Sequence, residues 1–220
     1  MPYADRAAAG RALVAPLDGF CGSDAVVLAL PRGGVPVAAE IARALDLPLG
    51  LALVRKVGLP FQPELAVAAL AGPKGETLVV NDDVARHAGL TPDRIEDLAA
   101  PERAELARRA ALWLGAHPPP DLTGRTVILV DDGLATGATM RAAVAWARSA
   151  GAASVVAAVP VGAPSSISAL RDLADAVICP EVPVRFRAVG LHYRDFRQIE
   201  DPEVRAILDA HARAGRTNGA

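Results

Sequence analysis

The stretch VILVDDGLATGAT, residues 127–139, contains the features that decide both the fold class and the candidate site. An apolar run ends in two adjacent aspartates, Asp131 and Asp132, and a loop of small residues and threonines follows. Helical spacing begins immediately afterwards, at Met140. A buried strand that passes through a short loop into a helix is typical of a parallel sheet with covered faces.

Apolar runs elsewhere in the chain predict the other strands, and helical patterns separate them. We therefore predict an α/β fold, in which a mostly parallel sheet carries helices on both faces. The predicted strands of this sheet are residues 25–30, 49–54, 125–130, 154–161 and 176–182. The predicted helices are residues 5–20, 35–47, 140–151 and 165–174. Residues 65–72 and 76–82 are predicted to pair as two strands across a turn at 73–75.

Two segments depart from this alternation. Residues from about 83 to 117 read as a helical insertion, in which Pro101 should kink or restart the helix predicted at 92–114. The chain from residue 183 also breaks the rhythm and contains two of the four phenylalanines. We predict a core over residues 1–182, including the insertion, and a small C-terminal hood and tail over 183–220.

The composition excludes several classes of protein. The chain has 220 residues, and a formal net charge of −2 gives no broad basic field for nucleic acid. Its two cysteines and four histidines are scattered, so a structural zinc site is not expected. No apolar run approaches the roughly 20 residues that span a bilayer, and the first residues lack a signal-peptide core. A cytoplasmic protein without membrane partners is the expectation.

The quoted stretch has the chemistry of a sugar phosphate site. Ligands of open parallel sheets bind beyond the carboxyl ends of the strands, where Asp131 and Asp132 are predicted to lie. Their oxygens can accept hydrogen bonds from sugar hydroxyls. The following helix N-terminus favours a phosphate, Gly137 allows close approach, and the hydroxyls of Thr136 and Thr139 add donors. A pentose 5-phosphate satisfies both halves of this unit.

The same residues resemble the phosphoribosyl pyrophosphate (PRPP) signature of the type I phosphoribosyltransferases. That signature has four apolar residues, two acids, a short spacer and a loop similar to T-G-x-T. The resemblance implies that Asp131 and Asp132 hold the ribose 2- and 3-hydroxyls. It further implies that the 5-phosphate is wrapped by Ala135, Thr136, Gly137, Ala138 and Thr139. The resemblance covers roughly residues 24–182.

Two further segments match the order of features in this family. LPRGG, residues 30–34, stands where the family has its pyrophosphate loop, often with a cis peptide bond that does not precede proline. Its Arg32, Gly33 and Gly34 would turn backbone N–H groups toward an anion. VRKVGLP, residues 54–60, is similar to the segment that opens the mobile loop of purine-type members. The resemblance implies that its Arg55 and Lys56 meet pyrophosphate oxygens.

The tail is similar, less closely, to the hood of hypoxanthine-guanine enzymes. Within VRFRAVGLHYRDF, residues 184–196, Phe186 would stack on a purine, and Tyr193 and Phe196 are further candidates. These aromatic residues could equally fix the tail to the core. Ala135 stands where hypoxanthine-guanine enzymes have an aspartate, and the loop itself resembles that of adenine enzymes. Loop and tail therefore point to different purines.

The resemblance implies a reaction for the whole site. A ring nitrogen would take the 5-phosphoribosyl group from PRPP and release pyrophosphate, as in purine salvage. Catalytic roles would fall to Asp131, Asp132, Arg55 and Lys56, with Mg²⁺ carried by PRPP near the two aspartates rather than by a protein cluster. The partners would be PRPP and a small nucleobase-like acceptor, and the prediction allows a homodimer. The alternative is a regulator on the same fold that senses PRPP or a nucleotide without catalysis.

Overall fold

The computed structural model describes residues 2–115 and 119–217, including their side chains except those of 63, 64 and 215–217. The last residues of the predicted insertion, 116–117, and of the predicted tail, 218–220, lie outside the described residues. A five-stranded parallel sheet forms the centre, in the order β2-β1-β6-β7-β8. These strands span Leu49–Leu51, Val26–Ala29, Thr126–Val130, Ser154–Ala158 and Ala176–Ile178 respectively. The predicted α/β class is confirmed.

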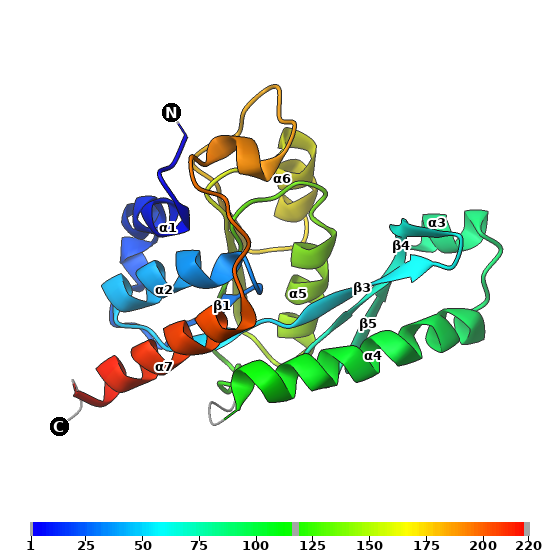
Figure 1. Ribbon diagram of the computed structural model, residues 1–220, viewed down its shortest axis with the longest axis horizontal. Helices are drawn as coiled ribbons and strands as arrows, with labels where there is room; N and C mark the ends of the chain where they lie inside the picture. Colours follow the sequence, from blue (N-terminus) through cyan, green and yellow to red (C-terminus); the bar gives the residue numbers. More distant parts are fainter. Residues whose placement is uncertain (1, 116–118, 218–220) are drawn as a thin grey trace.

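Helices cover both faces of this sheet, and alternation along each strand decides which face a side chain meets (Figure 1). On β6, Ile128 and Val130 belong to the apolar cluster shared with α1 and α2, whereas Val127 and Leu129 belong to the cluster shared with α5 and α6. The helices of the first face are α1 (Arg6–Val14), with a short 3-10 turn at Ala15–Phe20, α2 (Gly34–Leu45) and α7 (Asp201–Thr217). Those of the second face are α5 (Ala138–Ser149) and α6 (Pro164–Arg171).

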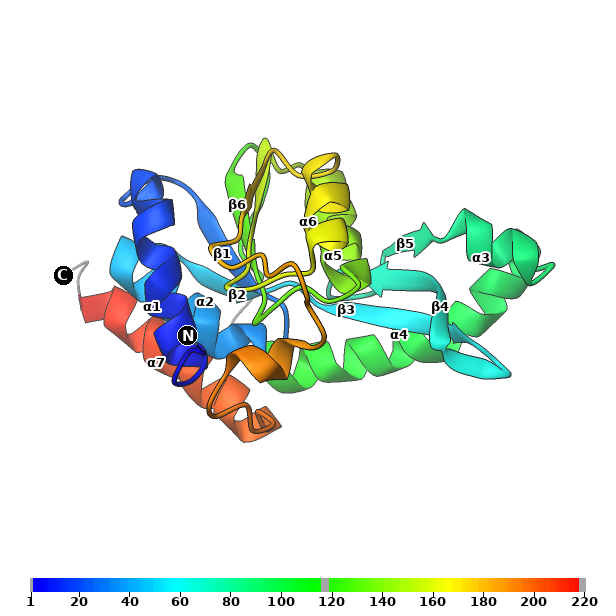
Figure 2. The same ribbon diagram turned by 90° about the horizontal axis from the view of Figure 1, so that it is seen from above.

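An arm extends from one side of this core (Figure 2). It contains an antiparallel sheet of β3 (Val54–Leu59), β4 (Gln62–Ala71) and β5 (Thr77–Val80), with α3 (Asp82–His87) and α4 (Pro92–Leu114). The pairing of β4 with β5 confirms the predicted strand pair. The predicted single strand at 49–54 is wrong, because the run divides into β2 in the parallel sheet and β3 in the arm. Ala52 and Leu53, both buried, join the two sheets.

Helix α4 continues through Pro101 as one element, so the predicted restart does not occur. Its side chains explain why. Ile95 and Ala99 before the proline and Leu106 after it are all buried in the same apolar cluster, so tertiary packing outweighs the hydrogen bond that proline removes. The helix ends at Gly115, whose φ is +44°.

The tail contains a helix, α7, that the sequence analysis did not predict. Helix α7 buries Val204 and Leu208 and packs against α2 and β2. Before it, residues 183–200 cross the carboxyl ends of the strands with only a 3-10 turn at Val189–His192. No helix in the ranges that the structure describes is long and apolar enough to cross a membrane.

Candidate active site

Asp131 and Asp132 follow the last residue of β6, which is fully buried. The backbone N–H of Asp132 donates to Oδ1 of Asp131 at 2.8 Å, so the turn orients the first carboxylate. Burial raises the pKa of Asp131 well above its ordinary value, and the neighbouring charge of Asp132 adds to this increase. Burial also raises the pKa of Asp132, although a hydrogen bond and the charge of Arg6 oppose it. The pair therefore favours a cationic or hydrogen-bond-donating ligand.

Arg6 contacts this acid pair, and the sequence analysis did not identify it. Its Nε donates to Oδ2 of Asp132 at 2.8 Å, and its Nη1 donates to the carbonyl oxygen of Arg197 at 2.7 Å. Its guanidinium lies 4.0 Å from the ring centroid of Phe196. Only 8% of the residue is exposed. An arginine in the first turn of a helix carries no local sign of burial, because its partner lies 126 positions away.

Residues 30–34 form a tight turn beside the acid pair. The Pro31–Arg32 peptide bond is cis, as the family resemblance predicted. A Cβ atom at Gly33 would lie 2.1 Å from Oδ2 of Asp132, and one at Gly34 would lie 2.5 Å from the carbonyl oxygen of Val130. Gly34 meets backbone atoms, so only glycine fits there, whereas a side chain at residue 33 would have to displace the Asp132 carboxylate.

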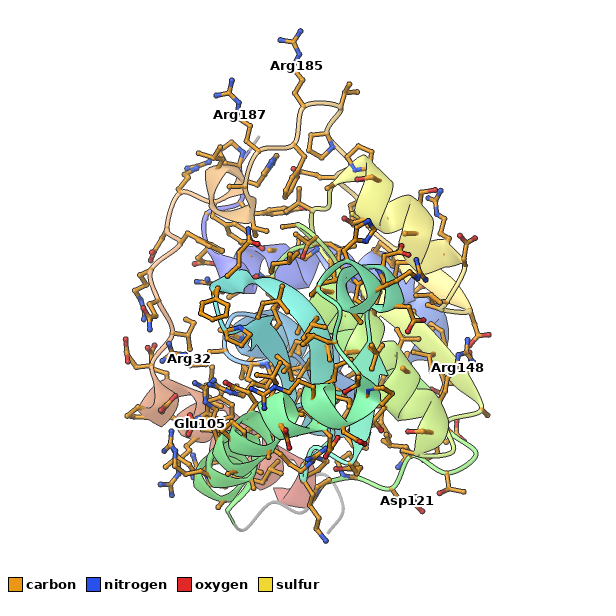
Figure 3. The ribbon with its side chains drawn as sticks, turned by 90° about the vertical axis from the view of Figure 1, so that its right-hand side faces the viewer. Arg32, Glu105, Asp121, Arg148, Arg185 and Arg187 are labelled. Carbon is orange, nitrogen blue, oxygen red and sulfur yellow. The ribbon has the colours of Figure 1, made fainter. Side chains whose placement is uncertain are left out.

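The expected direction of the Gly34 N–H toward an anion is wrong. This N–H donates to the carbonyl oxygen of Leu30 at 3.0 Å, across the turn that precedes α2. In the described part of the chain, the N–H groups of Arg32 and Gly33 have no backbone acceptor. The side chain of Arg32 lies 3.7 Å from Glu200 and 3.6 Å from Asp201, at the start of α7. Figure 3 labels Arg32 beside the segment that leads into α7.

The loop 133–139 is held near its start by residues that follow β7. The N–H of Leu134 donates to the carbonyl oxygen of Val161, and the carbonyl oxygen of Leu134 accepts from the N–H of Ala163. Ser166 Oγ on α6 donates to the carbonyl oxygen of Ala135 at 2.5 Å, a contact that the sequence analysis missed. Residues 135 and 136 stay exposed at the start of α5, where Gly137 adopts φ +74° and caps the helix. The helix N-terminus can therefore accept a phosphate, with Thr136 and Thr139 beside it.

Arg55 and Lys56 lie on β3 of the arm, and the structure does not bring them to the acid pair. Arg55 forms an ion pair with Glu102 of α4, and its Nη1 lies 4.0 Å from Glu105. Lys56 is exposed and pairs in register with Ala69 of β4. Among the residues that the structure describes, no hydrogen bond or ion pair joins either cation to Asp131 or Asp132.

The segment 184–196 lies on the same side of the sheet as Asp132, as predicted. Tyr193 OH donates to the backbone carbonyl oxygen of Asp132 at 2.6 Å. A Cβ at Gly133 would lie 2.5 Å from a methyl group of Val189, which shows how closely this segment covers the strand end. Arg185 and Arg187 extend away from the body of the molecule (Figure 3).

The three candidate aromatic residues differ in how accessible they are. Tyr193 is 6% exposed, and its ring packs between those of Tyr3 and Phe196 at centroid distances of 5.7 and 4.9 Å. Tyr193 therefore fixes the tail to the core. The Phe186 ring stacks on His192 with centroids 5.8 Å apart and planes 9° apart. Phe186 is partly exposed and Phe196 is 36% exposed, so either ring could offer a face to a planar ligand.

Comparisons with known proteins identify the family of this chain. Residues 7–118 and 97–195 match the family described as "Phosphoribosyl transferase domain". A protein of Mycobacterium tuberculosis strain H37Rv, provisionally named phosphoribosyl transferase Rv0571c, is 46% identical over 99% of this chain. The chain spans half the length of that relative. The crystal structure of TT1426 from Thermus thermophilus is 41% identical, with a TM-score of 0.83 over 94% of this chain and 98% of that one. The chain belongs to the phosphoribosyl transferase domain family.

Proposed function

We propose that the protein transfers the 5-phosphoribosyl group of PRPP to a ring nitrogen of a purine-like base and releases pyrophosphate. The observation that carries this proposal is the unit formed by β6, the loop 133–139 and α5. It presents two carboxylates and then a helix N-terminus within nine residues of chain, from Asp131 to Thr139. Ribose hydroxyls and a 5-phosphate need these two groups in this order.

The ribose would be held by the acid pair. Asp132 Oδ2 is taken by Arg6, and within the described residues no hydrogen bond reaches Oδ1 of Asp132, so that oxygen can accept a sugar hydroxyl. Two adjacent carboxylates also fit Mg²⁺, which binds through one or two carboxylates together with substrate phosphates. The metal would neutralise charge that develops on the departing pyrophosphate. The described residues contain no group of three or more His, Cys, Asp or Glu that could hold a metal alone.

The pyrophosphate would lie over residues 31–33. The unbonded N–H groups of Arg32 and Gly33 support this assignment, since such groups stabilise an anion without reorganising. Arg55 and Lys56 would add charge only after the arm and the acid pair approach each other. We propose this approach as part of substrate binding.

The acceptor would bind between the acid pair and the hood. We assign residues 1–182 to PRPP binding and to the arm, and residues 183–200 to the hood. Phe186 would stack on one face of the base, and backbone groups after β8 would meet its edge. A planar aromatic base that carries ring nitrogens fits this combination.

One observation favours the alternative, a regulator that binds PRPP or a nucleotide without turnover. Both Arg55 and Asp132 are already in ion pairs with residues of the same chain, Glu102 and Arg6. A sensor could keep these contacts permanently, whereas an enzyme must reorganise at least the contact of Arg55.

The two functions can be separated by one experiment. PRPP and Mg²⁺ are supplied with a pool of purine and pyrimidine bases. Pyrophosphate release is followed, and mass spectrometry identifies any new nucleoside monophosphate. The enzyme requires both products, with loss in Asp131→Asn and Asp132→Asn variants. PRPP binding without either product would indicate the sensor, and failure to bind PRPP or ribose 5-phosphate would reject the site.

A further inference from the structure

The hood is joined to the N-terminal segment as well as to the sheet. Tyr3 N–H donates to the carbonyl oxygen of His192 at 2.8 Å, and the carbonyl oxygen of Tyr3 accepts from the N–H of Arg194 at 2.9 Å. The N–H of Asp195 donates to the carbonyl oxygen of Ala4 at 3.0 Å. Residues 3–4 and 192–195 thus run side by side as a short backbone pairing. The position of the hood therefore depends on the N-terminal segment that leads into α1.

Helix α1 is itself fixed to the core. Its N-cap Asp5 accepts from the N–H of Ala8 at 2.7 Å. A Cβ at Gly10 would lie 2.5 Å from the carbonyl oxygen of Val37 on α2, so the two helices approach closely. The first residue of α1 is Arg6, so the backbone from which its side chain extends is fixed by the helix.

Arg6 uses three parts of one guanidinium for three different contacts. Nε meets the Asp132 carboxylate, Nη1 meets the backbone of Arg197, and the plane covers the ring of Phe196. The first contact belongs to the candidate ribose site, and the other two belong to the hood. The planar, forked donor geometry of arginine allows this combination, and a lysine ammonium cannot reproduce it.

We propose that Arg6 is a positioning residue that sets the ribose site and the acceptor site together. It holds Oδ2 of Asp132 so that Oδ1 faces the sugar, and the same side chain fixes the hood at Phe196 and Arg197. The inference rests on the proposed function, because it assigns Asp132 to the ribose. It also goes further, since it makes the order of the hood depend on a residue at the far end of the chain.

The test compares three variants and two measurements. Binding of ribose 5-phosphate with Mg²⁺ is measured by calorimetry, and hydrogen exchange is measured for the backbone amides of residues 189–199. The matched control is Arg11→Gln, because Arg11 lies on the same helix, is exposed and pairs with Glu40 at 3.6 Å, away from Asp132. All measurements are made at a temperature at which each variant is folded by circular dichroism.

The variants should separate the two roles of Arg6. Arg6→Gln should bind ribose 5-phosphate about 10-fold or more weakly, as for one lost charge-assisted hydrogen bond, and should exchange faster at 189–199. Arg6→Lys should keep affinity within about 3-fold, because an ammonium still supplies a charged donor to Asp132, and should nevertheless show the faster exchange. Arg11→Gln should match the wild type in both measurements. A purely structural role would lower the melting temperature of an Arg6 variant without this division.

Several outcomes would overturn the inference. One is wild-type affinity and wild-type hood exchange in Arg6→Gln, or wild-type hood exchange in Arg6→Lys if the glutamine variant does not fold. Another is tighter binding of ribose 5-phosphate by Arg6→Gln, because Arg6 would then compete with the sugar instead of orienting its acceptor. If the wild-type protein itself does not bind ribose 5-phosphate, the proposed function fails and the inference fails with it.

Discussion

Gly33 and Asp132 approach each other so closely that a Cβ atom at residue 33 would lie 2.1 Å from Oδ2 of Asp132. The backbone of Gly33 has φ −61° and ψ −37°, a conformation that any residue adopts. Any effect of a side chain at residue 33 must therefore come from its contact with the Asp132 carboxylate and not from its backbone conformation.

Gly33→Ala is expected to displace the Asp132 carboxylate and to weaken ribose 5-phosphate binding. Overpacking of this kind lowers the free energy of unfolding by roughly 1–3 kcal/mol. Binding is affected because the displaced carboxylate is the proposed acceptor of the sugar hydroxyl. Binding is measured by calorimetry, with Gly19→Ala as the control because a Cβ at Gly19 meets nothing within 4 Å. Equal affinities for the two variants would show that the contact does not affect the sugar site.

Gly137 is required for its backbone conformation and not for space. Its φ is +74°, whereas a Cβ there would meet its nearest neighbour, Ser166, at an ordinary 3.6 Å. Gly137→Ala should therefore lower the free energy of unfolding by roughly 1–2 kcal/mol and should also weaken phosphate binding by distorting the start of α5. Gly124→Ala is the control, since Gly124 has φ +70° and no neighbour within 4 Å. Chemical denaturation and ribose 5-phosphate binding are measured for both. The phosphate assignment requires that only the Gly137 variant loses affinity.

Lys56→Ala should lower turnover more than it lowers affinity for ribose 5-phosphate. The proposed partner of Lys56 is the departing pyrophosphate, which ribose 5-phosphate lacks. Steady-state kinetics with PRPP and calorimetry with ribose 5-phosphate give the comparison, and Lys74→Ala provides an exposed lysine of the same arm as control. Similar losses in both measurements would remove Lys56 from the proposed role.

Phe186→Ala should weaken binding of the base by roughly 1–3 kcal/mol, as for stacking on single bases. PRPP affinity should be nearly unchanged, because the ring of Phe186 stacks on His192 of the hood and is not part of the proposed PRPP site. The measurement is the KM of the acceptor once the acceptor screen has identified it. Phe61→Ala is the control, since Phe61 is fully exposed at the tip of the arm. An unchanged KM in Phe186→Ala would leave the acceptor without a stacking residue.

His211 should make the fold less stable in mild acid. Burial lowers the pKa of His211, partly opposed by its contact with the carbonyl oxygen of Leu47 at 3.0 Å and by the charge of Asp46. The unfolded chain therefore takes up the proton first, and stability falls as pH decreases through the unfolded value of about 6.5. The free energy of unfolding, measured between about pH 7 and pH 5, should fall less in His211→Gln than in the wild type. His87→Gln, at an exposed position on α3, should behave as the wild type. A wild-type slope in His211→Gln would contradict the prediction.

The sequence predicts the centre of this molecule well because buried parallel strands are apolar along their whole length. Strand β6, the loop 133–139 and α5 follow directly from such a pattern. The run 49–54 shows the limit of the method. Its apolar character continues while its hydrogen-bonding partner changes from β1 to β4, and apolar character does not specify a partner. Helix α7 did carry a signal, in the spacing of Val204, Ile207 and Leu208, and this signal was overlooked.

The residues of the candidate site also fall into those that local sequence identifies and those that it does not. Asp131, Asp132 and Gly137 lie in one contiguous motif, so local sequence identifies them. Arg6 reaches Asp132 only through the packing of α1 on α2, and Ser166 reaches Ala135 only through α6. Such contacts depend on tertiary structure, and no local pattern encodes them. The ion pair of Arg55 with Glu102 was missed for the same reason.

The division of the run 49–54 has a consequence for how this fold can vary. Strand β6 is the next strand of the parallel sheet after β2 along the chain, so the whole arm is inserted between these two strands. The chain leaves the sheet at Leu51 and re-enters it at Thr126. Lengthening, shortening or replacing the arm would therefore leave the strand order and the position of Asp131 unchanged. The arm could therefore change in length and in its contacts over evolution while the sugar-binding half is inherited intact.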